Sequence, residues 1–147
     1  MGETGIVALA AWLIALSAYD LRQRRLPNLL TLPGGAAILV AAALTGHGVS
    51  ALLGAAALTG IYAAVHLTAP GALGAGDVKL AIGVGAMTGA FGMQAWALCA
   101  VGASLLTGLW GCARLLRGAR APVPHGPAMC LTAAAAVLVA VADPALR

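Results

Sequence analysis

One short polar stretch interrupts a strongly apolar sequence: Gly74-Ala75-Gly76-Asp77-Val78-Lys79. It places a carboxylate and an amine beside two glycines, between long runs that carry no charge. The chain has four acidic residues, and Asp20 is the only other one that lies away from the chain ends. Each of these two aspartates borders a long apolar run. They are therefore the first candidates for a functional site.

The composition predicts an all-α integral membrane protein. Of the 147 residues, 62% are hydrophobic and 8% are charged, whereas soluble domains carry about 25% charged residues. The runs 26–76, 80–113 and 121–142 contain no Asp, Glu, Lys or Arg. Because lipid cannot satisfy free backbone groups, such runs must form helices, and one helix needs about 20 apolar residues to cross the bilayer. We therefore expect a single membrane domain covering residues 1–147.

Turn-forming residues divide the apolar runs into six predicted spans. The expected spans cover residues 4–19, 29–45, 50–69, 78–89, 94–113 and 128–142. The run 80–113 is divided at residues 89–92, where two glycines favour a turn. Pro27 is expected near the start of the second span, because proline suits the beginning of a helix.

The basic residues predict the orientation of these spans. Successive loops alternate between the two sides of the membrane, so six spans place both termini on one side. Because basic loops stay in the cytoplasm, we expect both termini outside, and Asp20 and Asp77 at the cytoplasmic edge. Of the eight Lys and Arg residues, only Arg147 falls on the outer side. The residues on the cytoplasmic side are Arg22, Arg24, Arg25, Lys79, Arg114, Arg117 and Arg120.

The same charges argue against nucleic acid as a partner. The net charge of +4 is spread over short segments without interleaved aromatic residues, and the expected partner is the lipid bilayer. Arg22, Arg24 and Arg25 are interpreted first as orientation signals, and second as contacts to substrate or anionic lipid. Lys79 is also interpreted as an orientation charge, whose amine reaches the interface.

Two carboxylates at one membrane face can form an aspartic protease site. If the first and fourth spans bring Asp20 and Asp77 together, the two groups cannot both ionise cheaply and share a proton. One carboxylate then activates a water molecule while the other polarises the scissile carbonyl, without a metal ion or a covalent intermediate. Gly74 and Gly76 leave the backbone free to bend beside them.

Each aspartate also has a purely structural interpretation. Asp77 can cap the fourth span, where its side-chain oxygen would bind a free N–H group. Asp20 can neutralise Arg24, four residues later. His66, near the cytoplasmic end of the third span, is expected to be held by packing and one hydrogen bond rather than to act in catalysis. Spacing indicates no partner for His125.

No metal ion or other cofactor is predicted. The three histidines are scattered along the chain, and Cys99, Cys112 and Cys130 are isolated within apolar runs. The sequence contains no C-x-x-C pair. It therefore lacks the ligand spacing of a structural zinc site and the pattern of a disulfide framework.

Taken together, the polar segments resemble those of the type IV prepilin peptidases. The stretch 74–79 matches the family pattern G-x-G-D-x-K. Asp20, followed by a basic stretch and then by Leu26-Pro27-Asn28, resembles the segment of the family's first aspartate. Residues 123–127 are similar to a Pro-x-Gly-Pro segment near the family's last span. The three segments occur in the family's order, and the resemblance extends from about Tyr19 to the last span.

This resemblance implies an activity and a set of site residues. The family consists of polytopic aspartic endopeptidases of the cytoplasmic membrane, which remove the short basic leader of prepilins and pseudopilins on the cytoplasmic side. By this resemblance Asp20 and Asp77 form the catalytic pair. The supporting motif residues are Gly74, Gly76, Lys79, Pro27 and Asn28.

The sequence also departs from the family in two places. Long members carry an N-terminal C-x-x-C region that binds zinc, and they N-methylate the new N-terminus. No segment here corresponds to that region, so we expect peptidase activity alone. His125 occupies a position that is often aromatic in the family. Tyr19-Asp20 also resembles a motif of signal peptide peptidases and presenilin-like enzymes, but Pro27-Asn28 favours a prepilin peptidase.

Two other functions compete with the peptidase. A small proton-coupled transporter would place its acids deep in the membrane, whereas both aspartates are predicted at the membrane edge. A non-catalytic subunit of a secretion system fits if the two carboxylates never meet. The sequence leaves open the pilin substrate, the residue after the scissile bond and the oligomeric state.

Overall fold

The computed structural model describes residues 3–118 and 123–143, and this part of the chain is all-helical without strands. The expected all-α class is therefore confirmed. The division of the run 80–113 into two helices is also confirmed. The six helices are α1 (Glu3–Gln23), α2 (Asn28–Leu44), α3 (Gly48–Thr68), α4 (Ala75–Ala90), α5 (Met93–Leu116) and α6 (Gly126–Ala142).

Three of the described helices are long and apolar enough to cross a bilayer. They are the segments Thr4–Gln23, Gly48–Thr68 and Met93–Leu116, while α2 and α6 are apolar but shorter. Large apolar side chains such as Ile14, Leu53 and Leu105 are well exposed on the outside of the bundle, as expected of surfaces that face lipid. The count of six membrane spans stays a prediction.

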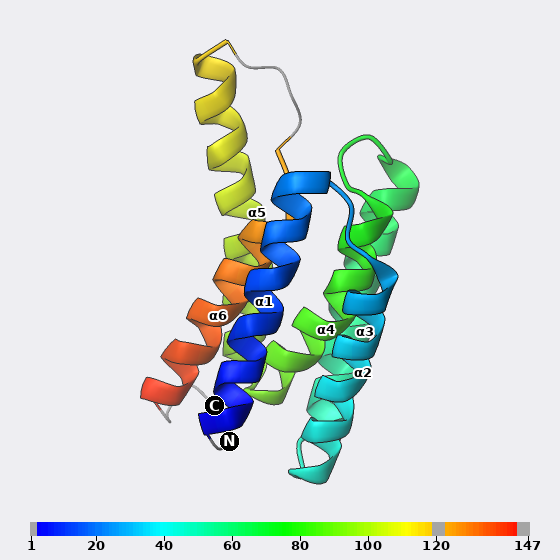
Figure 1. Ribbon diagram of the computed structural model, residues 1–147, viewed down its shortest axis with the longest axis vertical. Helices are drawn as coiled ribbons and strands as arrows, with labels where there is room; N and C mark the ends of the chain where they lie inside the picture. Colours follow the sequence, from blue (N-terminus) through cyan, green and yellow to red (C-terminus); the bar gives the residue numbers. More distant parts are fainter. Residues whose placement is uncertain (1–2, 119–122, 144–147) are drawn as a thin grey trace.

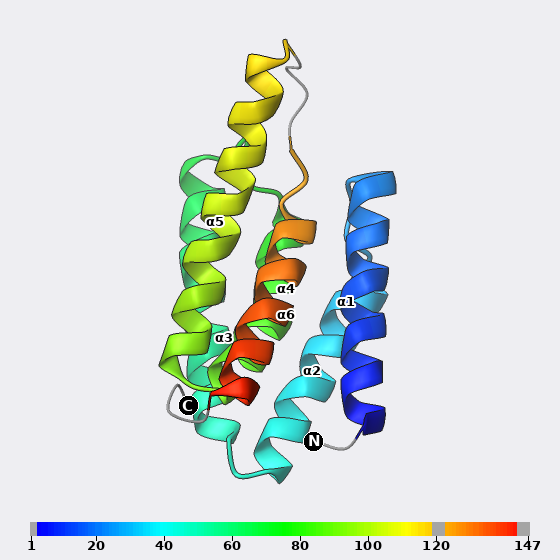
Figure 2. The same ribbon diagram turned by 90° about the vertical axis from the view of Figure 1, so that its left-hand side faces the viewer.

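The helices run roughly along one axis, and their connections lie at two opposite ends (Figures 1 and 2). The ends of α1, α3 and α5 point toward one end, from which α2, α4 and α6 start back. The start of α1 and the end of α6 lie at the other end, beside the α2–α3 and α4–α5 turns. Arg120 and Arg147 lie outside the described residues. The other Lys and Arg residues lie at the end of the bundle where α1, α3 and α5 finish. Successive loops of the described chain thus alternate between the two ends, as the orientation prediction assumed.

Helix α4 is the centre of the bundle and packs against α3, α2 and α6. Its side chains Leu80 and Val84 are fully buried. Glycines bring α3 and α4 into close contact: a Cβ atom placed on Gly85 would lie 2.6 Å from the carbonyl oxygen of Gly54. Small residues at such crossings let helix backbones approach each other in lipid. This close packing holds the first turn of α4, which carries Asp77, in a defined place.

Helix α1 packs mainly against α6 rather than against α4. Its Trp12 ring covers Gly34 and Gly83, and the indole N–H donates to the carbonyl oxygen of Leu30 at 2.9 Å. The sequence-based idea that the first and fourth spans form a packed pair is therefore wrong in detail. The two helices touch through the side chain of Trp12, and α6 carries most of the contact with α1.

Candidate active site

Asp20 lies in the last turn of α1, which continues past the expected boundary at Tyr19 as far as Gln23. Its carbonyl oxygen accepts a hydrogen bond from the N–H of Arg24 at 2.9 Å. Arg24 has a φ of +50°, the left-handed conformation that often terminates helices. The side chain of Asp20 is buried, with 7% of the residue exposed. Asp20 is therefore a helical residue in the last turn of α1 and not the first residue of the connecting loop.

Asp77 lies in the first turn of α4, three residues after the N-cap residue Gly74. Its Oδ2 accepts a hydrogen bond from the backbone N–H of Gly74 at 3.2 Å. The expectation that Asp77 itself is the N-cap is therefore wrong in position, although its carboxylate does satisfy an N–H group at the helix start. A carboxylate here is also stabilised by the positive end of the helix dipole. Its residue is 9% exposed.

Both carboxylates line one pocket of about 320 Å³ at the basic end of the bundle. No hydrogen bond joins the two carboxyl groups, and each instead accepts a backbone N–H: Gly74 donates to Asp77, and Gly126 donates to Asp20 at 3.0 Å. No ion pair within the described residues joins Asp20 to Arg24, but the positive charge of Arg24 still favours the ionised form of Asp20, so the alternative of partial neutralisation remains. The pocket is lined by Asp20, Arg24, Arg25, Leu26, Gly74, Ala75, Gly76, Asp77 and Lys79.

The two carboxylates are electrostatically coupled. Asp77 lies in the first turn of α4, just before the predicted fourth span 78–89, and lines the pocket. Burial, and after it the negative charge of Asp20, raises the pKa of the Asp77 carboxyl to about 6, against the opposing hydrogen bond from Gly74. Asp77 is therefore suited to hold a proton at mildly acidic pH. A carboxyl group that stays protonated beside an ionised one is the arrangement that a general acid and a general base require.

The Leu26-Pro27-Asn28 segment and the 74–79 segment lie about fifty residues apart in the sequence, and they contact each other directly. The Lys79 amine donates to the Asn28 side-chain oxygen at 2.8 Å, across 51 positions. Leu26 packs against Gly76, where an added Cβ atom would lie 3.2 Å from the Leu26 Cβ. Pro27 is the N-cap residue of α2, close to its predicted place. Lys79 thus has a specific partner beyond the orientation role expected for it.

A comparison with protein-family models places these residues in a family. Residues 7–112 match the model of the type IV leader peptidase family. The chain belongs to this family. It is thus a membrane aspartic peptidase of the prepilin peptidase type, and the matched region contains both Asp20 and Asp77. Neither the comparison with curated proteins nor that with solved structures returned a match.

His66 supports the loop that leads into the leader peptidase motif. Its Nδ1 lies 2.7 Å from the carbonyl oxygen of Leu73, the residue just before Gly74. A carbonyl oxygen only accepts, so this nitrogen carries the proton. The expectation of one hydrogen bond is confirmed, and His66 does not line the pocket. Of the three arginines predicted to contact substrate or lipid, Arg24 and Arg25 line the pocket, while Arg22 is exposed on α1 outside it.

His125 and Gly126 are residues whose importance sequence reasoning missed. The His125 ring lies between two hydroxyl groups, with Nε2 2.7 Å from Tyr62 Oη and Nδ1 2.7 Å from Thr107 Oγ1. Burial lowers the pKa of the His125 imidazole to about 4, so it is neutral. The only sequence signal for this segment was its similarity to the Pro-x-Gly-Pro segment of leader peptidases.

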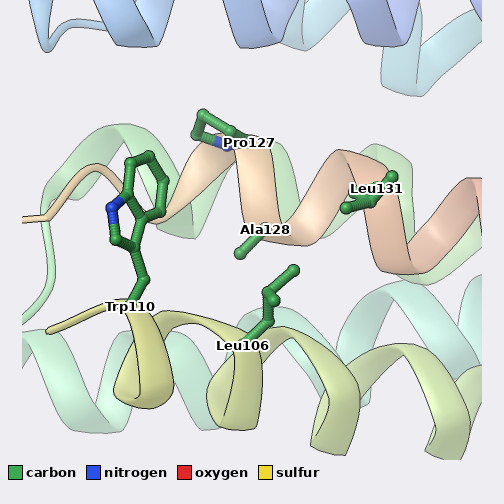
Figure 3. A pocket seen from close by; sticks show the side chains of 5 residues that line it. All are labelled: Leu106, Trp110, Pro127, Ala128 and Leu131. Carbon is green, nitrogen blue, oxygen red and sulfur yellow. The ribbon is translucent and has the colours of Figure 1, made fainter. Parts of the chain in front are cut away.

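The described residues contain no cluster of His, Cys, Asp or Glu that could hold a metal ion. A second pocket, of about 220 Å³, lies between α5 and α6 and is lined by apolar side chains only. Figure 3 shows Trp110 and Leu106 on α5 facing Pro127, Ala128 and Leu131 on α6. Without polar groups this pocket offers no chemistry of its own.

Proposed function

We propose that this protein is an aspartic endopeptidase that removes the leader peptide of type IV prepilins or prepilin-like proteins at the cytoplasmic face of the membrane. The observation that carries the proposal is that Asp20 and Asp77, the two acids of the chain interior, line one pocket. Family membership supplies the reaction class. In this proposal all six helices cross the membrane, both termini lie outside, and the pocket opens to the cytoplasm.

In the proposed mechanism the two aspartates start with one shared proton, which we assign to Asp77. The ionised Asp20 removes a proton from a water molecule, whose oxygen attacks the scissile carbonyl carbon. Asp77 gives its proton to the carbonyl oxygen, so that a neutral tetrahedral intermediate forms. Asp20 then donates its proton to the amide nitrogen as the C–N bond breaks, and the intermediate returns a proton to Asp77. Both carboxyl groups end in their starting states.

The surroundings of the pair fit this division of roles. Burial disfavours the ionised form of Asp20, and the hydrogen bond from Gly126 and the positive charge of Arg24 oppose that effect. The contacts Leu26–Gly76 and Lys79–Asn28 hold the start of α4 against the start of α2. Arg24 and Arg25 line the pocket and are proposed to contact substrate carbonyl groups or anionic lipid headgroups. We do not favour a transporter, because both carboxylates lie at helix ends rather than midway along a helix.

The test is leader removal in cells that express the protein together with a candidate prepilin. Asp20→Asn and Asp77→Asn should each abolish the gel shift that marks leader removal, while the amount of protein in the membrane stays the same. Asp143→Asn is the matched control, because it makes the same chemical change at the far end of α6. Normal cleavage by either pocket variant would overturn the proposal. Cleavage should also survive chelators, since no metal ion takes part.

A further inference from the structure

We propose that His125 is a positioning residue for catalysis: it holds the segment whose Gly126 amide orients the Asp20 carboxylate. The inference rests on the proposed catalytic role of Asp20. His125 does not touch the pocket, so it acts through its neighbour in the chain. It links three helices, because Tyr62 lies on α3, Thr107 lies on α5, and His125 itself precedes α6.

The imidazole matches its two partners in hydrogen-bonding capacity. A neutral ring has one N–H donor and one bare nitrogen acceptor, and a hydroxyl group can serve either of them. Both nitrogens of His125 are therefore satisfied by Tyr62 and Thr107 at 2.7 Å. Tyr62 is buried, with 6% exposed, and its hydroxyl has both His125 and the Ser104 side chain as partners, so removing the ring would take one of these partners away. The two short hydrogen bonds give the ring one preferred place between α3 and α5.

Gly126, the next residue in the chain, connects the His125 ring to the active site. Gly126 is buried, and its N–H donates to Asp20 Oδ2 at 3.0 Å. A Cβ atom at Gly126 would lie 2.7 Å from the same oxygen, so the backbone and the carboxylate are in close contact. A shift of the His125 ring must therefore move the donor that faces Asp20.

The residues that follow His125 are well packed, since Gly126, Ala128 and Met129 are buried. The apolar pocket between α5 and α6 lies beside Pro127 and Ala128 (Figure 3). The hydrogen bonds of His125 to Tyr62 and Thr107 add directional contacts to this packing and connect the loop to α3 and α5.

The test compares His125→Phe, Tyr62→Phe and Thr107→Val in a quantitative cleavage assay with purified protein and a prepilin substrate. His125→Phe keeps a ring of similar size and removes both hydrogen bonds. We expect its kcat to fall by about 10–100-fold, as for a small misplacement of a catalytic group, with little change in KM. Tyr62→Phe and Thr107→Val each remove one bond and should lower kcat by about 2–10-fold. The double variant His125→Phe/Tyr62→Phe should be no slower than His125→Phe alone, because both changes break the same Tyr62–His125 hydrogen bond.

The pH dependence separates positioning from a general loss of structure. Without the Gly126 donor, Asp20 would keep its proton to a higher pH, so the acidic limb of the pH–rate profile should move to higher pH in His125→Phe. His125→Gln, which retains a donor and an acceptor, should recover part of the activity. His47→Phe is the matched control, because His47 lies in an exposed turn at the opposite end of the bundle.

The outcomes distinguish this inference from the proposed function. If Asp20→Asn is inactive while His125→Phe has wild-type kcat and pH profile, the positioning role is overturned and the peptidase assignment stands. If Asp20→Asn cleaves normally, the proposed function itself fails. Equal losses of folded protein and activity, with kcat per folded molecule unchanged, would also overturn the inference. Thr107→Val decides the question if His125→Phe does not fold.

Discussion

The carboxylate of Asp20 accepts a hydrogen bond from the backbone N–H of Gly126 at 3.0 Å, and this contact joins the end of α1 to the start of α6 across 106 positions. The partner carboxylate, Asp77, is held differently, by Gly74 only three residues earlier in the chain. One member of the proposed pair is thus placed by tertiary contacts and the other by local helix geometry.

Gly126→Ala should lower activity without unfolding the protein. The added Cβ atom would lie 2.7 Å from Asp20 Oδ2, so the carboxylate must turn away from its place in the pocket. We expect a loss of about 10–100-fold in kcat, measured with a prepilin substrate. Gly108→Ala is the control, because an added Cβ atom at that position has no neighbour within 4 Å. Equal activity of the two variants would contradict the role given to the Gly126–Asp20 contact.

Asp77→Asn should stabilise the fold at high pH while abolishing cleavage. The pKa of Asp77 rises from 3.8 to about 6 on folding, so ionisation is less favourable in the folded protein. The stabilising contribution of the protonated group is present below pH 3.8 and is lost as the pH rises through about 6. Asparagine stays neutral throughout. Thermal unfolding in detergent should show nearly equal stability at about pH 3 and a variant more stable by about 1–3 kcal/mol at about pH 8. A variant less stable than the wild type at pH 8 would contradict burial as the cause of the raised pKa of Asp77.

The rate of cleavage should show a bell-shaped dependence on pH. Activity requires one protonated and one ionised carboxyl group, so kcat/KM falls at low pH when both are protonated. It falls again at high pH when Asp77 loses its proton, and we expect this basic limb near pH 6 in the free enzyme. In the wild type, the profile of kcat/KM between pH 4 and pH 9 measures both limbs. Activity that rises steadily from pH 6 to pH 9 would exclude Asp77 as the proton donor.

Loss of the hydrogen bond between Lys79 and Asn28 should lower the cleavage rate modestly, and losing either residue should have the same effect as losing both. It is an exposed hydrogen bond that holds the start of α4 against the start of α2. We expect Lys79→Met and Asn28→Ala each to lower the cleavage rate by about 2–10-fold, the usual range for one hydrogen bond. The double variant should lose no more than the stronger single variant, which a double-mutant cycle would measure. Fully additive losses would mean that the two residues act separately.

Much of the fold followed from short-range features of the sequence. Runs without charge predicted helices, because lipid leaves the backbone no other way to satisfy its hydrogen bonds. The glycines at residues 89–92 correctly predicted that α4 and α5 are separate helices, and Gly92 adopts a φ of +109°, which only glycine adopts readily. The boundary after Tyr19 was wrong because polar residues can extend a helix beyond its apolar part, and α1 continues to Gln23.

The site was predictable in its residues but not in its contacts. Isolated charge in an apolar chain was enough to select Asp20 and Asp77, and the structure brings both to one pocket. Their catalytic role stays a prediction. The pairing of α1 with α6, the Lys79–Asn28 hydrogen bond and the two partners of His125 were not foreseen.

The sequence by itself determined that this chain forms apolar helices with two acids at one end of the bundle, and its motifs placed it near the prepilin peptidases. Only the tertiary structure decided which helix faces which, and therefore that Gly126 rather than a side chain of α4 contacts Asp20. The physical reason is that charge, length and turn chemistry act between near neighbours in the chain. The contacts of His125 and Gly126 depend on how glycine surfaces and the Trp12 ring set the packing of separate helices, which no local pattern encodes.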